Sequence, residues 1–229
     1  MNSLSEVYST LLDYLLPELC PLCRAPSKNG YCDYCCNEFC IVPDPCPTCG
    51  LARPVDRCPR KDAIWHIDRV LAPLTYAQPA ISQIHALKFA SGRNLGRALG
   101  LILAGYLESR FDIDVDALIP IPLHTRRLRD RGYNQALEIA RPVAASLRLP
   151  LRIAGVRRIV ATKPLAELDA DSRRRNIAGA FSVTRNVDGL RIAVIDDVVT
   201  TGATANALAA ELLEAGAERV EAWAVARAL

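Results

Sequence analysis

The stretch IAVIDDVVTTGAT, Ile192–Thr204, joins an apolar run to two adjacent aspartates and then to a cluster of small hydroxyl-bearing residues. Residues 190–195 are almost wholly apolar and predict a buried strand, and residues 205–216 have the apolar spacing of a helix that ends at a glycine. The rest of the chain repeats this order. We expect further strands over residues 69–77, 116–123 and 219–228, and helices over residues 81–90, 94–111 and 134–149, the last interrupted or bent near Pro142. Strands that alternate with helices favour an α/β fold with a parallel sheet flanked by helices.

Ligands of parallel α/β sheets collect at the carboxyl ends of the strands. Here the loop after residues 190–195 enters a helix through Gly202, so that free backbone N–H groups and a partial positive charge are expected there. Thr200, Thr201 and Thr204 add hydroxyl groups around the same point. This predicts a cradle of monophosphate size, whereas the carboxylates need hydroxyl groups or a cation. A sugar phosphate meets both demands.

A second loop follows the expected strand 116–123 and contains four arginines within six residues, of which Asp130 offsets one. They are Arg126, Arg127, Arg129 and Arg131. Planar guanidinium groups at this edge of the sheet suit a pyrophosphate. For any one of these arginines, an ordinary solvated basic loop is the alternative.

The polar, non-periodic segment 157–183 predicts a hood that closes over a charged ligand. Its candidate contact residues are Arg157, Arg158, Lys163, Arg173 and Asn176.

All nine cysteines lie between Cys20 and Cys58. Two pairs with two-residue gaps predict a tetrahedral site for a structural zinc ion, formed by Cys20, Cys23, Cys32 and Cys35. A third pair, Cys46 and Cys49, is followed by Cys58, but Lys61 stands where a fourth cysteine is expected. Cys36, Cys40 or His66 could complete a second site, or one site could combine the first and third pairs.

Composition sets further limits. The chain has 229 residues and a formal net charge of +3, which by itself is too small to imply a nucleic-acid partner. Residues 1–20 have the pattern of a short amphipathic helix rather than of a signal peptide, and no apolar run reaches the roughly 18 residues of a membrane span. We therefore expect a cytoplasmic protein without a membrane span.

Ile192–Thr204 resembles the thirteen-residue 5-phosphoribosyl 1-pyrophosphate (PRPP) motif of type I phosphoribosyltransferases: four apolar residues, two acids, two apolar residues and TTGxT. The order of CPLC, IHALKFASGRNLG, LIPIPLHTRRLRDRGYNQA, SRRRNIAGAF and IDDVVTTGAT is similar to that of the ComF/GntX competence-associated family, over nearly the whole chain. The resemblance implies a type I phosphoribosyltransferase-like domain over residues 67–229 and an N-terminal zinc-finger module over residues 1–66. Lys61 and Leu165 depart from the family pattern.

The resemblance also implies roles for individual residues. Asp196, Asp197 and Arg131 are expected in catalysis. PRPP, which carries Mg²⁺, is expected to contact Val198, Val199, Thr200, Thr201, Gly202, Ala203, Thr204, Lys88, Arg126 and Arg127. The implied reaction is pentosyl transfer to an unidentified acceptor, linked to natural transformation. The alternative is a non-catalytic sensor of PRPP or a nucleotide that docks on DNA-import proteins or single-stranded DNA. A nuclease is less favoured, because two-metal sites need more carboxylates than these loops offer.

Overall fold

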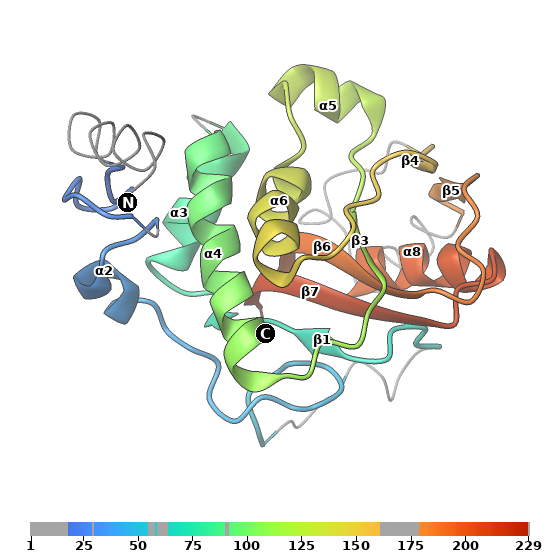
Figure 1. The fold of residues 1–229 in the computed structure, drawn as a ribbon, viewed down its shortest axis with the longest axis horizontal. Coiled ribbons are helices and arrows are strands. Elements are labelled where there is room, and N and C mark those ends of the chain that lie inside the picture. The colour runs from blue at the N-terminus through green and yellow to red at the C-terminus, as the bar shows by residue number, and fades with distance from the viewer. Residues whose placement is uncertain are drawn as a thin grey trace, which may run out of the picture.

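The computed structural model describes residues 18–28, 30–54, 58, 64–89, 92–160 and 179–228. A five-stranded parallel sheet forms its centre, in the order β1 (Val70–Leu71), β7 (Arg219–Arg227), β6 (Arg191–Val199) and β3 (Ala117–Pro120), with β2 (Leu74–Thr75) also on β7 (Figure 1). The expected α/β architecture is confirmed.

Helices cover both faces of the sheet (Figure 1). The helices α3 (Ala80–Phe89), α4 (Gly92–Arg110) and α6 (Gln135–Leu147) share one core with Ile195 and Trp223 of the sheet. A second core joins α8 (Ala203–Glu214) to Val194 and Ala224, which alternate with the first pair along the same strands. This alternation follows from the two-residue period of a strand, and it places buried side chains on both faces of β6.

Three elements differ from the sequence-based expectation. The strand expected over residues 69–77 is divided into β1 and β2, because Pro73 between them has no N–H to donate to a ladder. The helix α6 continues through Pro142, which packs so closely on α4 that a Cβ at Gly100 would lie 2.4 Å from the proline ring. The arginine loop contains a short helix, α5 (Thr125–Arg131), which ends at Gly132 in a left-handed conformation.

The segment expected as a hood is described only at its ends. There β4 (Val156–Arg158) and β5 (Phe181–Val183) form an antiparallel pair. Leu165, Lys163, Arg173 and Asn176 lie outside the described residues.

The N-terminal region packs directly on the sheet domain. Cys20, Tyr31, Cys35 and Phe39, the last three in and around the short helix α2 (Asp33–Asn37), belong to the same core as α4. Backbone hydrogen bonds add to this contact: Thr75 N–H donates to the carbonyl of Cys40 at 2.8 Å. The cysteine-rich N-terminal region and the sheet region therefore share one hydrophobic core.

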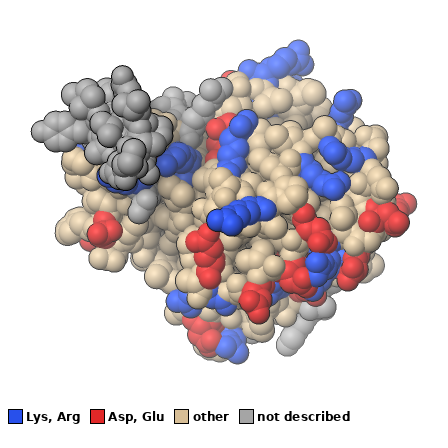
Figure 2. Space-filling view, in the orientation of Figure 1, with Lys and Arg blue, Asp and Glu red and all other residues tan. Residues whose placement is uncertain are grey.

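The described surface is mixed in charge. On the face shown in Figure 2, acidic and basic side chains are interspersed. Within the described part of the chain, no helix has the length and apolar character that crossing a membrane requires.

Candidate functional site

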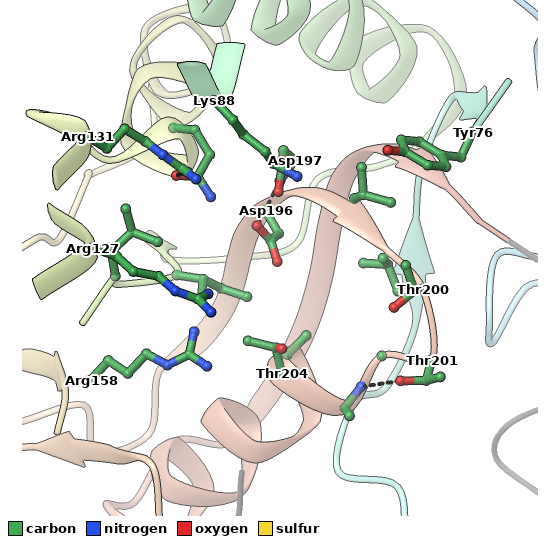
Figure 3. A pocket seen from close by; sticks show the side chains of 18 of the residues that line it. Tyr76, Lys88, Arg127, Arg131, Arg158, Asp196, Asp197, Thr200, Thr201 and Thr204 are labelled. Carbon is green, nitrogen blue, oxygen red and sulfur yellow. Dashed lines mark hydrogen bonds and ion pairs between the residues drawn. The ribbon is translucent and has the colours of Figure 1, made fainter. Parts of the chain in front are cut away.

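A cavity of about 650 Å³ lies beside the carboxyl ends of the parallel strands (Figure 3). It is lined by Tyr76 after β2, by Ile121 and Leu123 after β3, and by Asp196–Ala205 at the end of β6 and the start of α8. The other lining residues are Lys88, Arg127, Asp130, Arg131, Gln135 and Arg158. The two loops that follow the carboxyl ends of β3 and β6 therefore line one shared site.

The phosphate loop, which we define as residues 199–204, forms one side of this cavity. Gly202 caps α8 with a φ of 78°, a conformation that favours glycine. Thr201 Oγ1 accepts a hydrogen bond from the N–H of Ala203 at 3.4 Å. Within the described residues, the backbone N–H groups of Thr200 and Thr201 have no hydrogen-bond partner. Free N–H groups at a helix start that lines a cavity are suited to an anion.

The two aspartates belong to β6 itself, which continues beyond the apolar run to Val199 because β7 remains paired with it. Asp197 is buried on the face covered by α3, and Lys88 Nζ lies 2.6 Å from its Oδ2. Asp196 projects into the cavity (Figure 3), and its Oδ1 accepts a hydrogen bond from the N–H of Asp197 at 2.9 Å. The neighbouring acids thus have different partners.

Electrostatics distinguishes the acids further. Burial, followed by the charge of Asp197, raises the pKa of Asp196 well above its usual range. Burial lowers the pKa of Lys88, but the ion pair with Asp197 and the nearby Asp196 outweigh burial, so that the net pKa is raised. Lys88 therefore stays charged at neutral pH.

Three arginines form a cationic wall opposite the phosphate loop: Arg127 and Arg131 from α5 and Arg158 from β4 (Figure 3). Burial lowers the pKa of Arg131 and that of Arg158. Arg131 Nη1 donates to Gln135 Oε1 at 2.5 Å, which joins the end of α5 to the start of α6.

The turn between these helices is fixed by Asn134, the N-cap residue of α6. Its Oδ1 accepts from the N–H of Ala136 at 3.0 Å, and its Nδ2 donates to the carbonyl of Ile121 at 3.0 Å. Asn134 thereby holds the helix pair against the end of β3.

The structure brings together most of the residues singled out from the sequence. Lys88, Arg127, Arg131 and all of Asp196–Thr204 line the cavity. Arg126 does not: it is exposed on α5 and absent from the lining. Sequence reasoning missed Tyr76 and Gln135. The strand-end rule could have found Tyr76, which directly follows β2, whereas Gln135 lies inside the first turn of α6, where it accepts a hydrogen bond from Arg131.

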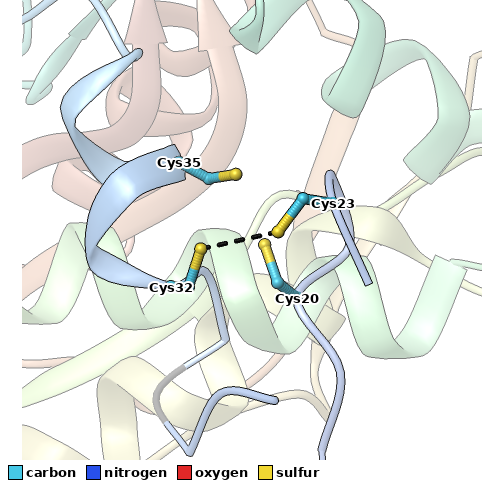
Figure 4. A group of neighbouring side chains, drawn as sticks. All are labelled: Cys20, Cys23, Cys32 and Cys35. Atoms are coloured by element: carbon cyan, nitrogen blue, oxygen red, sulfur yellow. Dashed lines mark hydrogen bonds between the residues drawn. The ribbon is translucent and has the colours of Figure 1, made fainter. Parts of the chain in front are cut away.

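The cysteine cluster is a second candidate site (Figure 4). The Sγ atoms of Cys20, Cys23, Cys32 and Cys35 all lie within 4.8 Å of one another. Zinc–sulfur bonds of about 2.3 Å in a tetrahedron separate the sulfur atoms by about 3.8 Å, so this group fits a structural Zn²⁺. Burial raises the pKa of the Cys20 thiol, but backbone N–H groups, that of Cys23 first, bring it down to about 6. A thiolate, the form that binds zinc, is therefore favoured there.

No second set of four mutually close thiols occurs among the described residues, although the thiol of Cys49 lies within hydrogen-bonding reach of those of Cys46 and Cys58. Cys46 and Cys49 lie in a turn in which the N–H of Gly50 donates to the carbonyl of Cys46 at 3.0 Å. Cys36 and Cys40 instead have their sulfur atoms near the carbonyls of Tyr31 and Gln78. Of the arrangements left open by the sequence, the structure contains the one that joins the first and second pairs.

Comparison with known proteins gives relatives along nearly the whole chain, although no family model matches it. The DNA utilization protein YhgH of Escherichia coli strain K12 is 34% identical over 226 residues, covering 93% of this chain and 99% of that protein. Competence protein F of Haemophilus influenzae is 30% identical over 214 residues, covering 88% and 92%. A ribose-phosphate pyrophosphokinase of Vibrio parahaemolyticus is 32% identical over 143 residues, covering 59% of this chain and 42% of that one.

Among solved structures, a purine phosphoribosyltransferase from Pyrococcus horikoshii aligns with 69% of this chain and 87% of its own, at 14% identity and a TM-score of 0.35. The full-length matches establish the family that the order of motifs had indicated. The chain belongs to the family of DNA utilization protein YhgH and competence protein F.

Proposed function

We propose that the protein binds PRPP, or a closely related ribose phosphate, together with Mg²⁺ and transfers its pentosyl group to an acceptor. The observation that carries this proposal is the composition of one cavity. A phosphate loop, a pair of carboxylates and a cationic wall surround it, in the order that a phosphate, a ribose and a pyrophosphate require. The partial match to ribose-phosphate pyrophosphokinase, whose name contains ribose phosphate, supports the same ligand class.

Each part of the cavity has a role in this proposal. The backbone N–H groups and hydroxyls of the phosphate loop hold the 5-phosphate. Asp196 and Asp197 accept hydrogen bonds from the ribose hydroxyls. Arg127, Arg131 and Arg158 hold the pyrophosphate through charge-assisted hydrogen bonds.

The reaction requires the bond from C1 of the ribose to the pyrophosphate oxygen to break, with its electron pair leaving on the pyrophosphate. Asp196 and Asp197 stabilise the positive charge that develops on the ring, and the cationic wall stabilises the leaving group. An acceptor lone pair then forms the new bond to C1, and the acceptor releases its proton. Carboxylate and phosphate oxygens are ligands that Mg²⁺ prefers, and in this position the ion supplies charge neutralisation for the pyrophosphate.

We propose in addition that Cys20, Cys23, Cys32 and Cys35 hold a structural Zn²⁺. The cluster offers four thiols and no position for a substrate, which favours folding support over catalysis. Metal analysis should give about one zinc per chain, and a value far below one would refute this part.

The family names connect the protein to DNA utilization and competence. We propose that its activity serves that process, with DNA-import proteins or single-stranded DNA as partners. A non-catalytic sensor is the second candidate. The Lys88–Asp197 ion pair favours it, because an acid that would stabilise the ribose cation is already neutralised.

Two measurements test the proposal. Isothermal titration calorimetry with magnesium-PRPP should give saturable binding that the Asp196→Asn, Asp197→Asn double variant weakens. Asp112→Asn, an exposed acid after α4, is the matched control and should bind as the wild type does. Wild-type protein that fails to bind PRPP, or a double variant that binds it equally well, would refute the site.

A screen for pyrophosphate release over bases, ammonia donors and single-stranded DNA then separates the two candidates. Release with one of them supports the transferase. Binding without release in every mixture supports the sensor.

A further inference from the structure

A buried arginine outside the cavity holds the phosphate loop from behind. Arg227, in β7, is only 2% exposed, and it donates to backbone carbonyls rather than to acids. Its Nη1 lies 2.8 Å from the carbonyl oxygen of Val199 and also donates to that of Thr200, while its Nε lies 2.7 Å from the carbonyl oxygen of Cys49. Within the described part of the chain, no carboxylate forms an ion pair with it.

The contacts with Val199 and Thr200 fix the orientation of two peptide groups. In a planar trans peptide, the carbonyl and the N–H of the next residue point in opposite directions. The carbonyls of Val199 and Thr200 face Arg227, so the N–H groups of Thr200 and Thr201 face away from it. These are the N–H groups that have no partner among the described residues and that belong to the cavity lining. Arg227 therefore helps to orient both N–H groups; it shares the Val199 carbonyl with the N–H of Ala228, which donates to it at 3.0 Å.

The third contact of Arg227 connects the loop to the cysteine-bearing turn Cys46–Gly50. This turn is itself attached to the sheet, since the N–H of Val70 donates to the carbonyl of Thr48 at 2.9 Å. Gly50 has a φ of 70°, and a Cβ there would lie 2.9 Å from the carbonyl oxygen of Val70. A displacement of the turn therefore moves the carbonyl of Cys49 that Arg227 binds.

The segment that follows the cysteines contacts the same loop. The ring of Trp65 lies so close to Gly202 that a Cβ there would be 2.5 Å from it. The N–H of His66 donates to Oδ1 of Asn206 at 2.6 Å, and Asn206 donates back to the carbonyl of Ile64 at 3.0 Å. The phosphate loop and the start of α8 are thus held by N-terminal residues on two sides.

We propose that Arg227 is a positioning residue for the phosphate loop and couples it to the turn Cys46–Gly50. This proposal rests on the proposed function, because it assumes that the loop holds the 5-phosphate of a ribose. Its specific consequence is an asymmetry between ligands. The hydrogen bonds described for Arg227 all go to backbone carbonyls, two of them in the phosphate loop and none in α5 or β4. It should therefore affect the binding of a monophosphate and leave that of a pyrophosphate unaffected.

The test compares two probes, ribose 5-phosphate and magnesium pyrophosphate, by calorimetry on the full chain. Arg227 donates to four backbone carbonyls, those of Cys49, Val199, Thr200 and Ala228. The Arg227→Lys variant keeps the charge but cannot reach all four with one ammonium group. We expect it to bind ribose 5-phosphate about tenfold more weakly, the effect of losing one well-aligned hydrogen bond, with its affinity for pyrophosphate unchanged within about twofold.

Arg219→Lys is the matched control. Arg219 stands at the other end of the same strand and also donates to a backbone carbonyl, that of Asp114 at 2.6 Å, but it lies away from the cavity. The Arg219→Lys variant should bind both probes as the wild type does. A purely structural role of Arg227 predicts equal losses for the two probes, which would overturn the proposal, as would no loss for either.

A second variant acts from the turn and keeps the buried charge. Gly50→Ala should also weaken the binding of ribose 5-phosphate and not that of pyrophosphate. The double variant with Arg227→Lys should lose less binding free energy than the sum of the two single variants, because both substitutions act through the contact between Arg227 and the carbonyl of Cys49. Gly189→Ala, with a φ of 65° and no atom within 4 Å of its Cβ, controls for backbone strain alone. Additive effects would overturn the coupling to the turn. Wild-type protein that binds neither probe would refute the proposed function itself, and this inference with it.

Discussion

The two sides of the cavity offer different groups to a ligand: backbone N–H groups on one side and arginine side chains on the other. The phosphate loop is backbone: its N–H groups are oriented by Arg227 and its turn depends on Gly202. The cationic wall is made of three long side chains from α5 and β4, which carry charge at the ends of flexible stems. A backbone cradle is formed before the ligand arrives and discriminates by shape, whereas a wall of arginines adapts to its ligand and discriminates mainly by charge.

The largest effect is expected where the two sides meet, at the Lys88–Asp197 ion pair. Lys88→Met leaves Asp197 buried without its cation and should lower the free energy of unfolding by about 3–5 kcal/mol. Chemical denaturation at neutral pH measures this, with Lys88→Arg as the control that keeps the charge. A loss below about 1 kcal/mol, typical of surface pairs, would mean that water reaches Asp197.

The phosphate loop should be intolerant of a single methyl group. In Gly202→Ala the new Cβ lies 2.5 Å from the Trp65 ring, and the φ of 78° strains any L side chain. We expect a loss of roughly 2–3 kcal/mol of stability, from strain and overpacking together, and loss of ribose 5-phosphate binding with pyrophosphate binding retained.

Gly179→Ala is the control for Gly202→Ala, because its φ of 67° is similar and no atom lies within 4 Å of its Cβ. Thermal unfolding and calorimetry report the two effects separately. Equal behaviour of the two variants would show that Trp65 does not restrain the loop.

The cationic wall should show the opposite selectivity. Arg131→Ala removes one charge-assisted hydrogen bond to the pyrophosphate, at a cost of about 1.5–3 kcal/mol of binding free energy, and leaves ribose 5-phosphate nearly unaffected. Arg126→Ala, on the exposed side of the same helix, is the matched control and should change neither. If Arg126→Ala weakens pyrophosphate binding as much as Arg131→Ala does, then Arg126 also belongs to the cationic wall, although it does not line the cavity.

The smallest effect concerns Asp196. Because its pKa is raised in the folded state, its stabilising contribution is complete below the pKa of the unfolded chain and is lost as the pH rises through the folded pKa. We therefore expect the melting temperature of the wild type to fall relative to that of Asp196→Asn as the pH increases from acidic to neutral. A constant difference between the two across that range would contradict the burial of this carboxyl group.

The sequence predicts the phosphate loop well because its pattern is local: strand, acids, threonines and glycine are contiguous. The cationic wall is predicted only in part. Arg158 is an expected contact residue of the hood segment, but its place beside Arg127 depends on the pairing of distant segments, which no local pattern reveals. Arg127 and Arg126 are adjacent and identical in type, and only the helical turn of α5 separates their directions. The ion pair of Lys88 with Asp197 and the contacts of Arg227 could not be read from the sequence either, because both depend on which carboxylate or carbonyl the fold brings within reach.

The position of Trp65 has a spectroscopic consequence. The chain contains two tryptophans, and Trp223 is completely buried in the core between the sheet and α4. Trp65 lies against Gly202 of the phosphate loop. The indole emission of a Trp223→Phe variant would therefore come from a fluorophore in contact with the proposed ligand cradle, so that a change of this emission on addition of ribose 5-phosphate would report binding there without any label.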